Sequence, residues 1–138
     1  MLILDTNVLS ALRRPERSPQ IQSWLSRQDE ATVYLSVITV GEIERGIARQ
    51  ETTNPAFARD LRDWLTRTVT MFSDRLLPFG AAEAQIWGRL SARIGHNGAD
   101  LLIAATAIAH DATVVTGNIA DFQPSGCRLL DPFGEYPA

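Results

Sequence analysis

The chain has 138 residues, of which 45% are hydrophobic and 21% charged, and its formal net charge is −3. These proportions are ordinary for a globular protein, so we predict one domain over residues 1–138. The acidic balance argues against a domain that coats nucleic acid without sequence preference, because such domains are usually basic. All 13 basic residues are arginine, which excludes mechanisms that need a lysine, such as P-loop phosphate binding. No apolar run reaches the roughly 20 residues of a membrane span.

The first predicted strand, residues 2–4, is wholly apolar and runs directly into Asp5. A continuous apolar run is typical of a strand that is buried on both faces of a parallel sheet. Ligands of such sheets bind at the carboxyl ends of the strands, so Asp5 is well placed for chemistry. The alternative is that Asp5, Thr6 and Asn7 only form a turn and cap a helix.

The remainder of the chain alternates predicted helices with predicted strands. Helices are indicated by apolar side chains at helical spacing and, at Pro19 and Pro55, by proline in the first helical position. Pro78 places the third strand at an edge of the sheet. The alternation predicts an α/β fold, a three-layer α/β/α sandwich around a mostly parallel sheet of about five strands. We predict helices at 7–14, from 19, 37–50, from 55, 81–94 and 100–110, and strands at 2–4, 33–36, 76–79, 113–116 and 128–130.

Four acidic residues occupy functional positions in this scheme. Asp5 follows the first strand, Glu42 lies early in the helix after the second, Asp100 opens an almost wholly apolar helix, and Asp121 lies just past the fourth strand. If all four face one crevice, their charges repel and their pKa values rise unless a cation lies between them. Oxygen ligands favour a hard divalent ion, Mg²⁺ or Mn²⁺. One ion, or two about 3.5–4 Å apart, could then activate water for phosphodiester hydrolysis.

Each acidic residue also has a structural alternative. Glu42 stands three residues after Thr39, so the two could form a capping box. Asp100 could merely interact with the dipole of its helix, and Asp121 could be a loop residue. Asp100 departs most from its alternative, because a charge at the start of the most apolar helix must be paired, hydrated or functional.

Four segments of the chain resemble the PIN-domain ribonucleases, and most closely the VapC-type toxins of bacterial toxin–antitoxin pairs. The segments lie in order along essentially the whole chain, which the resemblance identifies as a single PIN domain. They are Leu-Ile-Leu-Asp5-Thr-Asn7, Leu-Ser-Val-Ile-Thr-Val-Gly-Glu42-Ile-Glu-Arg-Gly46, Asp100-Leu-Leu-Ile-Ala-Ala-Thr-Ala and Val-Val-Thr116-Gly-Asn118-Ile-Ala-Asp121-Phe.

The resemblance implies a metal-dependent RNA endonuclease. Asp5 and Asp100 would bind Mg²⁺ or Mn²⁺ most directly, and Glu42 and Asp121 would complete the acidic pocket. Polar positions that orient water, carboxylates or phosphate in the family correspond here to Asn7, Thr116 and Asn118. Relatives often carry arginine where this chain has Gly117, so a phosphate contact is missing or comes from another arginine.

The resemblance also implies partners and a location. Similar toxins are usually dimers, and a small antitoxin covers the acidic pocket and inhibits them. We therefore expect an RNA substrate, a cognate antitoxin, and a homodimer or a larger assembly with that antitoxin. The expected location is the bacterial cytoplasm, which a single cysteine, Cys127, also suits because it cannot form an internal disulfide.

Other interpretations remain open. A haloacid-dehalogenase-like phosphatase would use Asp5 as nucleophile, but it normally needs a second carboxylate where this chain has Asn7. A phospho-receiver domain needs an acidic pair and a lysine. A PIN-fold binding module without catalysis is the alternative from another class. Arg13 and Arg14 could contact RNA phosphates or could be solvated, and Phe57 and Trp64 could form an exposed patch or belong to the core.

Overall fold

The computed structural model describes residues 1–134 and contains one sheet of five parallel strands. The strand order is β3-β2-β1-β4-β5, so the first strand of the chain lies at the centre. Because every strand runs in the same direction, the residues that follow the strands meet at one edge of the sheet. The strands are β1 (Leu2–Leu4), β2 (Val33–Ser36), β3 (Leu76–Leu77), β4 (Thr113–Val115) and β5 (Arg128–Leu130).

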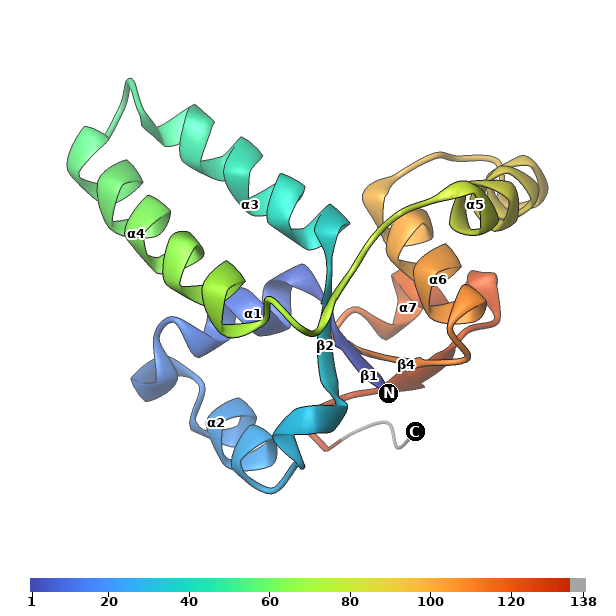
Figure 1. The fold of residues 1–138 in the computed structure, drawn as a ribbon, viewed down its shortest axis with the longest axis horizontal. Helices are drawn as coiled ribbons and strands as arrows, with labels where there is room; N and C mark the ends of the chain where they lie inside the picture. Colours follow the sequence, from blue (N-terminus) through green and yellow to red (C-terminus); the bar gives the residue numbers. More distant parts are fainter. Residues whose placement is uncertain (135–138) are drawn as a thin grey trace.

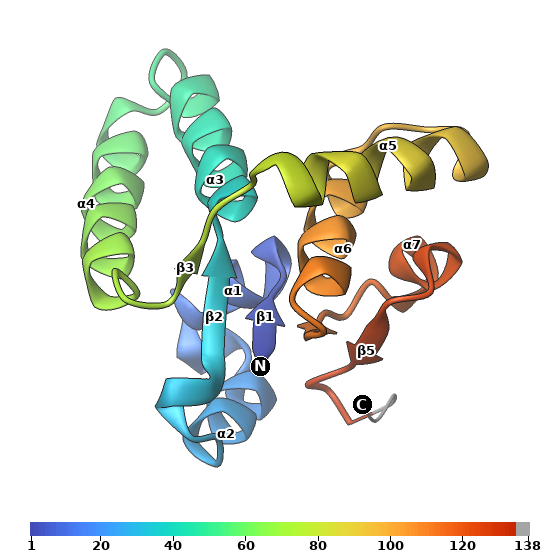
Figure 2. The same ribbon diagram turned by 45° about the vertical axis from the view of Figure 1, so that its right-hand side comes forward.

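Helices cover both faces of this sheet (Figures 1 and 2). On β1, Leu4 packs into a core with α1 to α4, whereas its neighbour Ile3 packs into a second core with α5, α6 and α7. Successive side chains of a strand point to opposite faces, which is why one strand serves both cores. The helices are α1 (Thr6–Leu12), α2 (Pro19–Ser26), α3 (Val37–Gln50), α4 (Pro55–Met71), α5 (Ala81–Ile94), α6 (Ala99–Ala109) and α7 (Ile119–Phe122), and the 3-10 turns are η1 (Pro15–Arg17), η2 (Glu30–Thr32) and η3 (Gln123–Ser125).

The three-layer α/β/α architecture around a parallel sheet confirms the fold predicted from the sequence. The third strand is an edge strand as expected, although it is shorter than predicted and ends before Pro78. The first helix begins at Thr6, one residue before its predicted start, and ends at Leu12, two residues before its predicted end. Asp121, for which a loop position was the structural alternative, lies in the short helix α7.

The almost wholly apolar helix α6 lies in the core, as its sequence predicts. Ala104, Ala105 and Ala107 are all 0% exposed, because their small side chains allow the helix backbone to lie close to its neighbours. Since α6 leads directly into β4, its first turn lies at the edge of the sheet where the parallel strands end. That turn carries Asp100. Within residues 1–134, no helix combines the length and the apolar character that a membrane crossing requires.

Candidate active site

Asp5 forms the centre of the site, directly after β1. The residue is 4% exposed, and the backbone N–H of Thr6 donates a hydrogen bond of 2.7 Å to its Oδ1. Its Oδ2 accepts a 2.8 Å hydrogen bond from the hydroxyl of Thr116, which follows β4. The backbone N–H of Asn118 in turn donates to that hydroxyl at 2.9 Å. Residues that follow β1 and β4 therefore fix both oxygens of one buried carboxylate.

Glu42 is held by the first helix rather than by its own. The hydroxyl of Thr6 donates a 2.6 Å hydrogen bond to Glu42 Oε1 and lies 3.2 Å from the hydroxyl oxygen of Thr39. The cap of α3 is Ser36, whose Oγ accepts from the backbone N–H of Ile38. The alternative that Thr39 and Glu42 form a capping box is therefore wrong. Glu42 remains free of a capping role and faces α1.

Asp100 and Asp121 complete the acidic group from the other face of the sheet. Asp100 lies half-buried in the first turn of α6, and Asp121 lies exposed in α7. Burial raises the pKa of Asp100, and the neighbouring charges of Asp121 and Glu42 raise it further, whereas His96 opposes them. The acidic side chains from α3, α6 and α7 are thus close enough to influence the ionisation of one another.

The pKa of Asp5 is raised from 3.8 to about 6. Burial is the largest cause, because a charged carboxylate loses its hydration there. The hydrogen bonds from Thr116 and Thr6 lower the pKa, whereas the charges of Asp100 and Glu42 raise it. The raised pKa values of Asp5 and Asp100, each beside other carboxylates, are expected of a site that binds positive charge.

The donor set suits a hard divalent cation, since it consists of carboxylate oxygens whose repulsion such an ion would relieve. The donors come from different elements, Asp5 after β1, Glu42 from α3, Asp100 from α6 and Asp121 from α7. Over residues 1–134, no three acidic, histidine or cysteine side chains already converge as a metal site. The residues thus fit the ion by the chemistry of their donor atoms alone.

The two asparagines predicted for the site, Asn7 and Asn118, differ in their contacts with it. The side chain of Asn7 is exposed on α1, and among the described residues it forms no hydrogen bond with the acidic group. Asn118 contributes through its backbone, which orients the Thr116 hydroxyl. At Gly117, an added Cβ would lie 3.0 Å from Cε2 of Phe133. The aromatic ring of Phe133 thus occupies the space into which a side chain at position 117 would extend.

Thr6 is the site residue that sequence reasoning missed. It was considered only as part of a turn, yet it bonds Asp5 through its backbone and Glu42 through its hydroxyl. The sequence did point to Thr6 in one respect, because it lies between Asp5 and Asn7, which the resemblance assigns to the site. Its pairing with Glu42 spans 36 positions, which no local pattern reveals.

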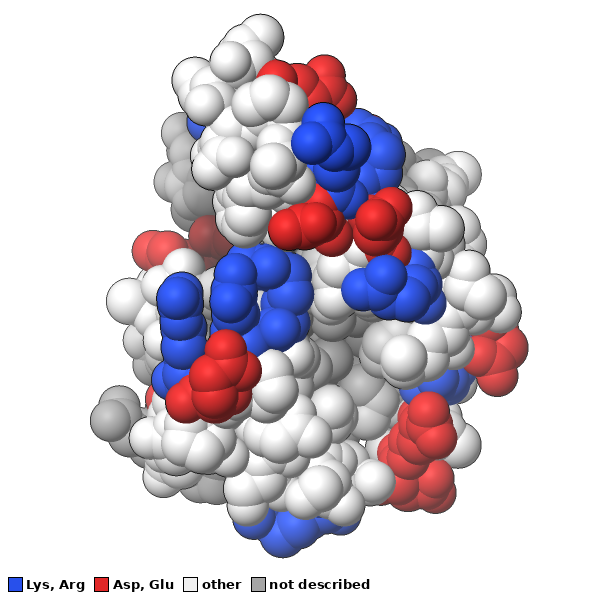
Figure 3. Space-filling view, turned by 90° about the vertical axis from the view of Figure 1, so that its left-hand side faces the viewer, with Lys and Arg blue, Asp and Glu red and all other residues white. Residues whose placement is uncertain are grey.

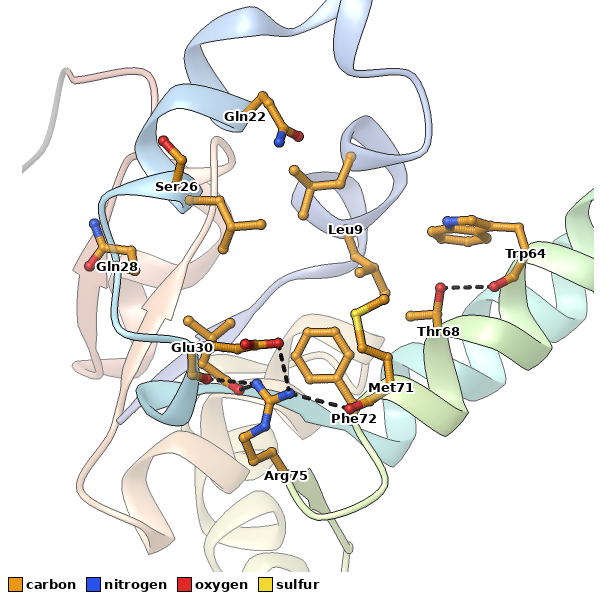
Figure 4. A pocket seen from close by; sticks show the side chains of 13 residues that line it. Leu9, Gln22, Ser26, Gln28, Glu30, Trp64, Thr68, Met71, Phe72 and Arg75 are labelled. Atoms are coloured by element: carbon orange, nitrogen blue, oxygen red, sulfur yellow. Dashed lines mark hydrogen bonds and ion pairs between the residues drawn. The ribbon is translucent and has the colours of Figure 1, made fainter.

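A large apolar hollow of about 420 Å³ lies elsewhere, between α1, α2 and α4 (Figure 4). Leu9, Met71 and Phe72 face it, and Arg75 lies at its rim. Arg75 donates to the backbone carbonyls of Glu30 and Val33 at 2.7 Å, so its charge is already satisfied. Because Val33 begins β2, this hollow lies toward the amino end of the strands and is separate from the acidic group.

A family model for the PIN domain matches residues 2–122 of the chain. The toxin FitB of Neisseria gonorrhoeae is 32% identical to it over 96% of this chain and 99% of its own length. The VapC ribonuclease Y4jK of Sinorhizobium fredii is 31% identical over 96% of this chain and 98% of its own length. In the crystal structure of FitAcB from Neisseria gonorrhoeae, one chain superposes with a TM-score of 0.83 at 32% identity, covering 97% of this chain and 99% of that chain. These similarities confirm the resemblance found in the sequence, and the chain belongs to the PIN domain family.

Proposed function

We propose that the protein is a metal-dependent RNA endonuclease that acts as the toxin of a toxin–antitoxin pair. The observation that carries the proposal is the acidic group at the carboxyl edge of the sheet. Asp5 follows the central strand β1 and Asp100 lies in the first turn of α6, and in both residues burial and neighbouring carboxylates raise the pKa. Perturbed pKa values of this kind cluster at functional sites.

The relatives support the class of substrate. Y4jK is named a ribonuclease and FitB is named a toxin, and each covers nearly the whole chain. A toxin of this kind would need an inhibitor in the cell that makes it, so a cognate antitoxin is the expected partner. A homodimer, a larger assembly with the antitoxin and a cytoplasmic location stay predictions from the family resemblance.

Asp5 and Asp100 would hold Mg²⁺ or Mn²⁺ most directly, and Glu42 and Asp121 would complete the coordination. When bound, such an ion supplies the positive charge that activates water and stabilises the leaving oxygen of a phosphodiester. In the hydrolysis, a water oxygen bonds to phosphorus while the bond between phosphorus and one ribose oxygen breaks. An ionised carboxylate of the group can accept the proton of that water.

The hydroxyl groups of the site keep the carboxylates in place. Thr116 holds Oδ2 of Asp5, and Thr6 holds Oε1 of Glu42. The hydrogen bond from Thr116 also lowers the pKa of Asp5 and so favours its ionised form. Ionised, oriented carboxylates are what metal binding and proton acceptance both require.

The proposal is tested by incubating purified, antitoxin-free protein with labelled total RNA in Mg²⁺, in Mn²⁺ and in chelator. We expect discrete fragments that require metal and are lost in the Asp5→Asn and Asp100→Asn variants. The matched control is Asp74→Asn, the same chemical change at an exposed carboxylate outside the site. Wild-type protein that leaves all RNA intact would contradict the nuclease and favour a binding module with the same fold.

A further inference from the structure

One face of α3 leads away from the candidate active site and is positively charged. Four side chains share this face, because they recur at steps of four, three and four residues. They are Ile38, Glu42, Arg45 and Arg49. Ile38 packs into the core that includes residues of α5, α6 and α7, so the face is turned toward the layer that carries Asp100 and Asp121.

Arg45 and Arg49, which we call the arginine stripe, are both exposed and follow Glu42 along the helix. Since an α-helix rises roughly 1.5 Å per residue, Arg45 stands about 4.5 Å beyond Glu42 along the axis and Arg49 about 10.5 Å beyond it. Beside burial and Asp121, the charge of Glu42 raises the pKa of Asp100, so these carboxylates are close to one another. The stripe therefore begins within about one helical turn of the acidic group and runs away from it.

The acidic residues beyond Glu42 on the same helix do not neutralise the stripe, because they are paired elsewhere. Arg62 of α4 donates to Oε1 of Glu44 at 2.8 Å and to Oε1 of Glu51, just past the end of α3, at 3.1 Å. Within the described residues 1–134, neither arginine of the stripe takes part in an ion pair. Two like charges therefore lie near each other on α3 without a carboxylate partner.

The side of the molecule that carries α4 has a different distribution of charge. Figure 3 looks at this side and shows arginine and acidic side chains interspersed. Charges of opposite sign that lie close together largely cancel at a distance, so a bound polyanion gains little from them. The stripe differs because both of its charges are positive and neither is paired.

A strand of RNA needs nearby positive charge to bind at the acidic group. The chain has a net charge of −3, and the carboxylates of the site repel the phosphates on either side of the cleaved bond. The planar guanidinium group of arginine matches the geometry of phosphate oxygens. Because Arg45 and Arg49 lie about 6 Å apart along the axis of α3, they can contact different phosphates of one strand.

We propose that the arginine stripe binds phosphates on one side of the cleaved phosphodiester and holds that part of the RNA strand along α3. The inference rests on the proposed ribonuclease function and adds the surface that binds the substrate. Contacts with phosphate position a nucleic acid but carry no information about its sequence. The stripe therefore strengthens the binding of all RNA sequences alike, and it contributes binding rather than chemistry.

Binding is measured by fluorescence anisotropy with a labelled single-stranded RNA oligonucleotide in chelator, at several salt concentrations. The full chain carrying Asp100→Asn serves as the background, so that no cleavage occurs. Arg45→Gln and Arg49→Gln each remove one charge, and the corresponding lysine variants keep it. The matched control is Arg27→Gln, which removes an exposed charge between α2 and the start of β2, at the opposite edge of the sheet.

We expect each glutamine variant of the stripe to weaken binding by roughly 5- to 10-fold at about 50 mM salt. The slope of log affinity against log salt concentration should become shallower by about 0.7 for each arginine, the value for one phosphate contact on a single strand. Arg45→Lys and Arg49→Lys should keep the background slope, as should Arg27→Gln. The inference is overturned if the stripe variants change no more than Arg27→Gln does, or if the background protein binds no RNA.

The alternative occupant of the stripe is a second copy of the chain. Size-exclusion chromatography compares the oligomeric state of the variants, and circular dichroism checks that each is folded. Stripe variants that change oligomeric state but bind RNA as the control does would assign Arg45 and Arg49 to an interface between copies and overturn the inference. RNA binding that weakens at an unchanged oligomeric state supports it.

Cleavage by proteins with the same substitutions in the otherwise wild-type chain separates this inference from the proposed function. The glutamine variants should raise KM and leave kcat nearly unchanged, because the stripe binds the substrate and the transition state equally. If wild-type protein cuts RNA and the stripe variants behave like Arg27→Gln, only the inference about the stripe fails. If the wild-type protein cuts no RNA with either metal while the stripe variants still lose RNA binding, the nuclease proposal fails and the stripe remains an RNA-binding surface.

Discussion

The hydroxyl of Thr6 donates a 2.6 Å hydrogen bond to Oε1 of Glu42 and thereby joins the first turn of α1 to α3. The backbone N–H of the same threonine donates to Oδ1 of Asp5. One residue therefore positions two carboxylates that come from different elements of the fold. Loss of a group that orients a metal-binding side chain in this way typically lowers metal affinity or activity by roughly 10- to 100-fold.

We predict that Thr6→Val lowers RNA cleavage by roughly 10- to 100-fold, because Glu42 loses the donor that holds it. The backbone bond to Asp5 remains, so the protein should stay folded. Thr6→Ser keeps the hydroxyl and should retain most of the activity. Cleavage rates of the two variants, measured at several Mn²⁺ concentrations, check this. Equal rates for the valine and serine variants would show that the hydroxyl is not needed.

Thr116 should control the pH dependence of the activity. Its hydrogen bond to Oδ2 lowers the pKa of Asp5, which burial has raised to about 6. Thr116→Val removes the bond, so we predict that the pKa of Asp5 rises further and the acidic limb of the pH–rate profile moves to higher pH. Thr116→Ser should leave that limb in place. A profile that does not shift in the valine variant would contradict the role assigned to this hydroxyl.

Asp5 should make the metal-free protein less stable as the pH rises. Its folded-state pKa of about 6 exceeds the ordinary value of 3.8, so the folded protein binds the proton more tightly than the unfolded chain does. The stability contributed by protonated Asp5 is fully present below about pH 4 and is lost as the pH rises through about 6. At pH values above that range, this difference between the two pKa values lowers the free energy of unfolding by about 3 kcal/mol.

We therefore predict that Asp5→Asn raises the free energy of unfolding by about 1–3 kcal/mol at pH 7.5 in chelator. The gain should shrink strongly near pH 4, where Asp5 is protonated in the wild-type protein as well. Urea unfolding of both proteins at the two pH values measures it. The same change in stability at both pH values would exclude ionisation of Asp5 as its cause.

Gly117 and Phe133 should be energetically coupled. A Cβ at position 117 would lie 3.0 Å from the Phe133 ring, which is 46% exposed and can move aside at some cost. We predict that Gly117→Arg destabilises the wild-type chain more than it destabilises a Phe133→Ala chain, by about 0.5–1 kcal/mol. A double-mutant cycle from urea unfolding measures this difference. Additive effects would show that the ring does not restrict position 117.

The fold could be predicted from the sequence because its signals are local. Apolar runs mark the buried strands, and helical spacing marks the long helices. The turns η1, η2 and η3 and the helix α7 are too short to produce a periodic pattern, so the structure of the segment around Asp121 was not predicted. The third and fourth strands end two residues and one residue before their predicted limits, since two or three residues carry little pattern.

The acidic residues of the site could be predicted because each follows or opens an element that the sequence reveals. The contacts between them could not, because hydrogen bonds such as Thr6 to Glu42 and Thr116 to Asp5 join residues 36 and 111 positions apart. The roles of Phe57 and Trp64 were likewise undecided. Their half-buried positions beside the site follow from the packing of α4 against α1 and α3, which is a property of the whole fold.

Metal binding to the acidic group is the most direct test of the central claim. Isothermal titration of the purified protein with Mn²⁺ near pH 7.5 should show binding by wild-type protein and by the control Asp74→Asn. Because Asp100→Asn removes one charged ligand, we predict that it weakens binding by roughly 10-fold or more. Wild-type protein that binds no Mn²⁺, or an Asp100→Asn variant that binds it as tightly as the control, would contradict a metal-dependent site built from these carboxylates.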